Sequence, residues 1–169
     1  MLTIYTARAS SLLYAAGVAL MLGGRWREGR VTRLVWTLGC AMLCVHALVA
    51  YHFVHRWSHA HALGHTADQT ASMVGVRTGA GVYLNYAVMV VWAADVLFWW
   101  TAGSGRYWRR SRTVVLGLHA FLLFMMFNAT IVFAHGGTRY AGLAVMACLV
   151  GLTIKRFGKG RGRLVDLQG

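Results

Sequence analysis

Proline is absent from this chain of 169 residues, and acidic residues are scarce, with four Asp and Glu in total. Without proline, no helix is forced to kink or end for lack of a backbone N–H. Charged residues make up 12% of the chain, about half the share of an ordinary soluble domain. The three cysteines lie inside apolar runs, which argues against the disulfide framework of a secreted protein. No nucleophile motif, glycine-rich phosphate loop or nucleotide fingerprint occurs, so the sequence assigns no catalytic residue and leaves enzymatic activity open.

Apolar residues are abundant instead, and they fall in long blocks. Hydrophobic residues are 58% of the chain and the mean hydropathy is +0.54. A membrane core of roughly 30 Å needs about 20 residues of helix, at 1.5 Å per residue. Five segments qualify as candidate spans: residues 3–22, 34–55, 82–102, 113–134 and 140–154. We therefore predict one domain over residues 1–169, an all-α integral membrane bundle of five transmembrane helices, or four if the short last segment does not span.

The basic residues predict the orientation of these spans. Thirteen of the seventeen Lys and Arg fall in the first and third loops and in the tail 155–169, and the other four are Arg8, Arg56, Arg77 and Arg139. Positive charge marks cytoplasmic loops. The N-terminus is thus predicted outside and the C-terminus in the cytoplasm, in the plasma (inner) membrane. The basic loops are expected to contact anionic lipids rather than nucleic acid, because the net charge of +13 is divided among short loops and a tail.

The second predicted span ends in the stretch YHFVHRWSHAHALGHTAD, residues 51–68, which holds five histidines. It leads into the long outer loop, residues 56–81, where TADQTA (66–71) meets no strong helix breaker until Gly75. This predicts a short helix that continues the second span or lies on the outer surface. If one helix continues through this stretch at 100° per residue, His52, His55 and His59 lie within about 60° of one another. His135 ends the fourth span on the same side.

Imidazole clusters of this kind bind transition metals, because neutral histidine is the commonest ligand for zinc and copper. We therefore predict that His52, His55, His59 and His135 hold a divalent metal such as zinc or copper, or haem b, with His61, His65 and Asp68 in reserve. The protein would then serve in redox chemistry or metal handling. The alternative is a cofactor-free accessory or structural subunit of a larger membrane complex, whose histidines rest in the lipid headgroups or face a partner.

A second polar pair is predicted inside the membrane. Asp95 in the third span and His119 in the fourth lie within roughly 3 Å of the same depth at 1.5 Å per residue. Ionisable groups at membrane depth face the bundle interior and find partners there. We therefore expect Asp95 and His119 to form a buried polar pair between two helices.

Overall fold

The computed structural model describes residues 2–23, 29–134 and 136–165, with the backbone alone for residues 156–165. Every regular element in these ranges is helical. The elements are α1 (Leu2–Leu22), α2 (Arg30–Phe53), α3 (His59–Val74), α4 (Gly81–Trp108), α5 (Arg112–Phe127), the π-helix η1 (Asn128–Val132) and α6 (Gly137–Val165).

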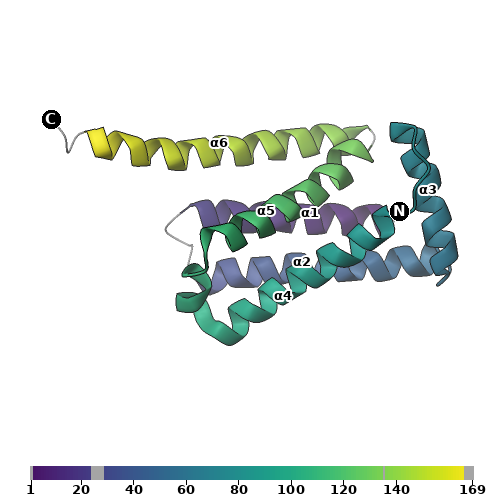
Figure 1. Ribbon diagram of the computed structural model, residues 1–169, viewed down its shortest axis with the longest axis horizontal. Coiled ribbons are helices and arrows are strands. Elements are labelled where there is room, and N and C mark those ends of the chain that lie inside the picture. The colour runs from purple at the N-terminus through teal and green to yellow at the C-terminus, as the bar shows by residue number, and fades with distance from the viewer. Residues whose placement is uncertain (1, 24–28, 135, 166–169) are drawn as a thin grey trace.

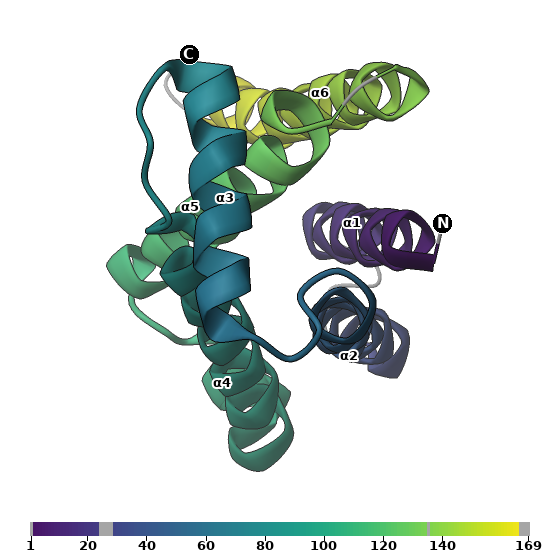
Figure 2. The same cartoon turned by 90° about the vertical axis from the view of Figure 1, so that its right-hand side faces the viewer.

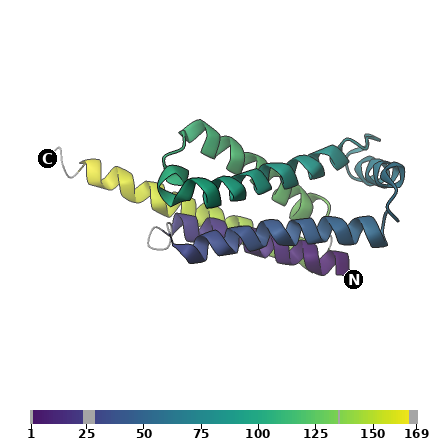
Figure 3. The same cartoon turned by 90° about the horizontal axis from the view of Figure 1, so that it is seen from below.

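Helices α1, α2 and α6 run along the length of the bundle, α4 and α5 are inclined to them, and α3 lies across one end (Figure 1). Seen from that end, α1 and α2 form one pair, α4 and α5 lie beside it, and α3 crosses in front (Figure 2). Helix α6 packs on α1 and η1 and extends beyond the other helices toward the C-terminus (Figures 1 and 3). We call the end crossed by α3 the α3 end. The opposite end carries the described basic residues Arg30, Arg33, Arg106, Arg109, Arg110, Arg112 and Lys155, and we call it the basic end.

Among the described residues, four helical stretches are long and apolar enough to cross a membrane: Arg30–Phe53, Gly81–Trp108, Arg112–Val132 and Gly137–Lys155. The segment expected to be too short is therefore among the four, because α6 begins three residues before the predicted span and continues beyond it. Helix α1 is 21 residues long but is not among the four. Two of its polar residues, Thr6 and Ser10, are buried against the bundle, whereas Arg8 is exposed.

The core is aromatic and lies toward the basic end. Trp36 of α2 and Trp92 of α4 are fully buried, with ring centroids 5.0 Å apart, and Tyr14 of α1 packs 5.7 Å from each. Two glycines allow this approach. A Cβ atom on Gly17 would lie 2.8 Å from the Trp36 ring, and one on Gly39 would lie 2.9 Å from the Trp92 ring. Since real Cβ atoms do not tolerate such distances, both positions require glycine for the helices to pack this closely.

Two local breaks define the α3 end. Helix α2 ends at Phe53, and the left-handed backbone of Arg56 (φ 48°) and Trp57 (φ 60°) turns the chain sideways. Ser58 then caps α3, its hydroxyl accepting from the His61 backbone N–H at 3.2 Å. Helix α3 ends on Gly75, whose left-handed φ of 75° suits glycine. The helix expected in the outer loop is thus a separate element that lies across the bundle.

Candidate functional site

The break between α2 and α3 separates the five clustered histidines into three groups. The predicted common face of His52, His55 and His59 assumed one continuous helix, but residues 54–58 interrupt it. His52 stays at the end of α2, where its Nδ1 accepts a hydrogen bond from Trp57 Nε1 at 3.2 Å. His59 begins α3 and contacts two tyrosine hydroxyls instead. The three predicted ligands therefore take different partners.

His55, His61 and His65 form the second group. The Nδ1 atoms of His55 and His61 lie 3.4 Å apart, and the ring centroids of His55 and His65 lie 5.4 Å apart. Burial lowers the pKa of His55 below its ordinary value, and the neighbouring His65 and His61 lower it further. The folded protein therefore keeps His55 neutral down to a lower pH than the unfolded chain does.

A metal site of the predicted kind finds no support in this arrangement. Among the residues that the structure describes, no group of three or more His, Cys, Asp or Glu side chains is arranged to hold a metal ion. His135 lies outside the described residues. Asp68 is on the exposed side of α3 and pairs with Arg77 at 2.9 Å, with both side chains about two-thirds exposed (66% and 69%).

Beneath α3 the bundle contains a cavity of about 160 Å³. Ala62 and Thr66 of α3 form its roof, and His55 stands at its edge. The apolar part of the lining includes Leu43, Val82, Val88, Met89, Met125 and Met126, and the polar part includes Ser10, His46, Tyr51, Asn85 and Tyr86. An apolar cavity of about 150 Å³ takes one benzene molecule, so this space suits a single ring.

His46 is the polar group of the cavity whose protonation the geometry defines. Its Nδ1 lies 3.1 Å from the Thr3 carbonyl oxygen and 3.2 Å from Thr6 Oγ1. A carbonyl can only accept, so Nδ1 must carry the proton. The Thr6 hydroxyl then accepts from Nδ1 and donates its own proton to the Leu2 carbonyl, 3.0 Å away. When His46 is neutral, its Nε2 therefore carries the lone pair, and no described residue hydrogen-bonds to that nitrogen.

Two tyrosines that line the cavity share a hydrogen-bond network with His59. The hydroxyls of Tyr51 (α2) and Tyr86 (α4) are hydrogen-bonded to each other. Both contact His59 Nδ1, at 3.3 Å from Tyr51 and 3.0 Å from Tyr86. The His59 ring also stacks on Tyr86 with 6.0 Å between centroids. This network connects the start of α3 to α2 and α4. It gives the His59 side chain hydrogen-bond partners without a metal ion.

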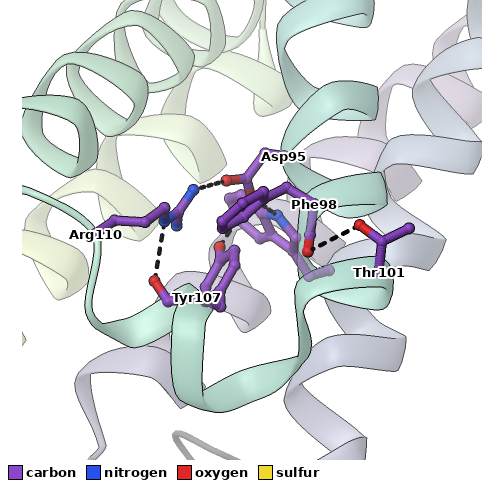
Figure 4. Close-up of polar contacts among 6 residues, drawn as sticks. Asp95, Phe98, Thr101, Tyr107 and Arg110 are labelled. Carbon is purple, nitrogen blue, oxygen red and sulfur yellow. Dashed lines mark hydrogen bonds and ion pairs between the residues drawn. The ribbon is translucent and has the colours of Figure 1, made fainter.

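At the other end, a buried carboxylate carries the second polar cluster. Asp95 is 5% exposed and accepts from Trp36 Nε1 at 2.8 Å and from the Tyr107 hydroxyl at 2.9 Å. Arg110 forms an ion pair with its other oxygen (Figure 4). The chain reaches this position because Gly103, with φ 74°, bends the end of α4 back on itself, and Tyr107 then stacks 4.0 Å from Trp99.

The predicted partner of Asp95 lies at the edge of this cluster. The ring of His119 packs on Trp36, 5.7 Å between centroids, and Trp36 in turn donates to the carboxylate. The hydrogen bonds of Asp95 thus go to Trp36, Tyr107 and Arg110, and a direct Asp95–His119 interaction stays a prediction.

Sequence reasoning missed His46, Tyr51 and Tyr86 as cavity residues, and it treated Arg110 as a loop charge. A usable signal existed for Tyr51 and Tyr86, because tyrosines near the ends of two neighbouring apolar segments can meet at one level. Comparison with protein-family models, with curated proteins and with solved structures finds no match to this chain.

Proposed function

We propose that this is an integral membrane protein with five membrane-crossing helices, α1 being the fifth. At 21 residues α1 is roughly 32 Å long, enough for a membrane core. It packs along α2, and its polar residues Thr6 and Ser10 are turned into the bundle, away from lipid. Leu2, Ile4 and Leu12 are exposed on its outer side, as a lipid-facing surface requires.

The basic end is the cytoplasmic end in this proposal, and the plasma (inner) membrane is the location. The support is the positive-inside rule, since most Lys and Arg gather where α1 ends, α4 turns into α5 and α6 emerges. The N-terminus, α3 and the cavity then face outside. Anionic headgroups on the cytoplasmic side are the natural partners of the basic loops.

The protein's function, we propose, is to bind a small molecule in the cavity beneath α3. The observation that carries this proposal is His46, which has Nδ1 fixed by Thr3 and Thr6 and Nε2 free. Pockets that bind small molecules combine an apolar lining with a few placed polar groups. The cavity has that composition, and its polar members come from four different helices.

The ligand class follows from size and hydrogen bonding. The space fits one ring. A lone pair on His46 Nε2 calls for a donor, so the ligand carries a hydroxyl or N–H group. A membrane-soluble compound with a phenol or quinol headgroup meets both requirements. A metal or haem site, and a cofactor-free accessory subunit of a larger complex, are the competing outcomes.

The test uses the purified full-length protein in detergent, with hydroquinone as probe and 1,4-dimethoxybenzene as its matched analogue without donors. We expect hydroquinone to bind one per protein and the analogue to bind roughly tenfold more weakly, the equivalent of one hydrogen bond. Ala47→Leu, which fills the cavity, should abolish binding. Ala41→Leu, on the exposed side of the same helix, is the control and should bind like the wild type.

Each other result contradicts the proposal. Equal binding in the Ala47→Leu and Ala41→Leu variants would place the probe elsewhere. A Soret band, or one metal ion per protein by elemental analysis, would restore the metal or haem hypothesis. If the protein binds neither the probe nor a metal nor haem, the hypothesis of a cofactor-free accessory subunit would remain.

A further inference from the structure

A second concave surface lies on the side of the bundle, between α1, α6 and the α5–η1 segment. It is a groove of about 310 Å³, and its lining includes Leu12, Ala15, Ala141, Val145 and Leu149. Gly142 lets α6 approach closely here, since a Cβ on it would meet the Thr130 carbonyl oxygen at 2.7 Å. The groove is mainly apolar, and Ser11 and Met126 line both it and the cavity beneath α3.

One cation stands at the end of this groove. Arg8 of α1 lines it and donates through its guanidinium to Thr138 Oγ1 near the start of α6, at 3.1 Å from Nε. A guanidinium has five N–H donors, so this contact leaves donors free. Thr138 accepts from Arg8 and keeps its own hydroxyl proton for another acceptor.

Arg8 is also without a negative partner among the described residues. The two described carboxylates, Asp68 and Asp95, pair with Arg77 and Arg110. Arg8 is exposed, at the level where lipid headgroups would lie, and a guanidinium there attracts an anion. Arginine binds phosphate through paired hydrogen bonds, which makes phosphate the fitting anion.

The length of the groove indicates what is attached to that phosphate. From Thr138 to Leu149 on α6 is eleven residues, roughly 16 Å at 1.5 Å per residue. A membrane hydrocarbon core is about 30 Å thick, so the groove is as long as one leaflet is deep. Arg8 stands at the α3 end of the groove, where the headgroups of that leaflet would lie.

We infer that this groove is a binding site for an anionic phospholipid, with its phosphate on Arg8 and Thr138 and one acyl chain between α1 and α6. The inference rests on the membrane insertion proposed above, but not on the ligand of the cavity beneath α3. The lipid would join α6 to α1, and α6 is otherwise among the least covered helices of the bundle.

The test is lipid retention by the full-length protein, extracted from nanodiscs that contain phosphatidylglycerol and phosphatidylcholine in equal amounts. Native mass spectrometry should show one phosphatidylglycerol bound in preference to phosphatidylcholine. Arg8→Gln should lower its affinity roughly tenfold or more, as expected when charge-assisted hydrogen bonds are lost. Ala141→Phe, which fills the groove, should remove the bound lipid.

Two variants serve as controls. Arg139→Gln removes a positive charge at the same end without lining the groove, and Ala144→Phe adds the same bulk to an exposed position of α6. Both should retain the lipid. Equal retention in Arg8→Gln and Arg139→Gln, or in Ala141→Phe and Ala144→Phe, would overturn the inference. So would a bound fatty acid without phosphate. Extraction without detergent would instead contradict membrane insertion itself.

Discussion

The two ends of the bundle both contain ionisable side chains, but they use them differently. At the basic end Asp95 is buried and its oxygens are taken up by Trp36, Tyr107 and Arg110. Toward the α3 end, His46 hydrogen-bonds to α1 through Nδ1, and no described residue hydrogen-bonds to its Nε2, beside a cavity. A fully partnered buried charge holds helices together, whereas a half-partnered group beside empty space is equipped to bind something else.

The largest effect should come from breaking the buried ion pair. Asp95→Asn leaves the Arg110 charge largely buried without a counter-ion, and we expect a loss of about 3 kcal/mol in the free energy of unfolding. Asp68→Asn breaks the exposed pair with Arg77 at the α3 end and should cost less than about 1 kcal/mol. SDS titration of the purified variants measures both. Equal losses would remove the distinction between the two ends.

A double-mutant cycle measures the coupling between Asp95 and Trp36. Because Trp36 donates directly to the carboxylate, Asp95→Asn and Trp36→Phe should be non-additive by roughly 1–2 kcal/mol. The predicted pair is tested in the same way, with His119→Gln in place of Trp36→Phe. We expect a smaller coupling there, because the His119 ring contacts Trp36, and it is Trp36 that donates to the carboxylate. Strict additivity with His119 would mean that the two groups do not interact.

Adding side-chain volume should also change stability by different amounts at the two ends. Gly39→Ala places a methyl group against the Trp92 ring and should destabilise the protein by about 1–3 kcal/mol. Ala47→Leu adds a larger group at the cavity beneath α3 and should change stability by less than about 1 kcal/mol, because space is available. Thermal unfolding in detergent compares them. A larger loss for Ala47→Leu than for Gly39→Ala would mean that the cavity is already filled by protein atoms.

The smallest effect concerns pH at the α3 end. The pKa of His55 is lowered by burial, then by His65 and His61, so the unfolded chain binds a proton at higher pH than the folded protein. The stability from neutral His55 is complete above about pH 6.5 and is lost as the pH falls from there through the folded-state pKa.

Thermal midpoints at pH 7.5 and 5.5 measure this effect. The drop on acidification should be smaller in His55→Gln than in the wild type, while the matched control His52→Gln should keep the full drop. An unchanged drop in His55→Gln would show that other groups cause it.

The long apolar runs were sufficient to predict the helices, because length and composition decide which segments can fill a membrane. A helix in the outer loop also followed from the sequence, since TADQTA (66–71) meets no strong breaker until Gly75, but its separation from α2 did not. The bounds differed mainly at α4 and α6, which continue past their apolar segments by six and eleven residues: predicted ends 102 and 154 against Trp108 and Val165. Polar residues can extend a helix beyond the membrane without any apolar signal.

The sites were harder to predict, for two physical reasons. The angular argument for His52, His55 and His59 needed an unbroken helix, and the left-handed backbone of two ordinary residues, Arg56 and Trp57, ended it. Such a conformation is unusual for residues other than glycine, so no local sequence pattern predicts it.

The partners of Asp95 were hidden for a related reason. Arg110 is fifteen residues further along the chain and reaches the carboxylate only because the chain reverses at Gly103. Helical periodicity locates residues on a face but not across such a reversal. The prediction that Asp95 faces inward was available from the sequence, and the identity of its partners was not.

Nitrogen NMR on protein with ¹⁵N-labelled histidine tests directly whether His46 presents a bare Nε2 to the cavity beneath α3. The His46 signals, assigned by their loss in a His46→Phe variant, should show a proton on Nδ1 and none on Nε2. Addition of hydroquinone should shift the Nε2 signal toward its hydrogen-bonded position, and 1,4-dimethoxybenzene should leave it unchanged. A proton on Nε2, or an Nε2 signal that ignores hydroquinone, would contradict the account.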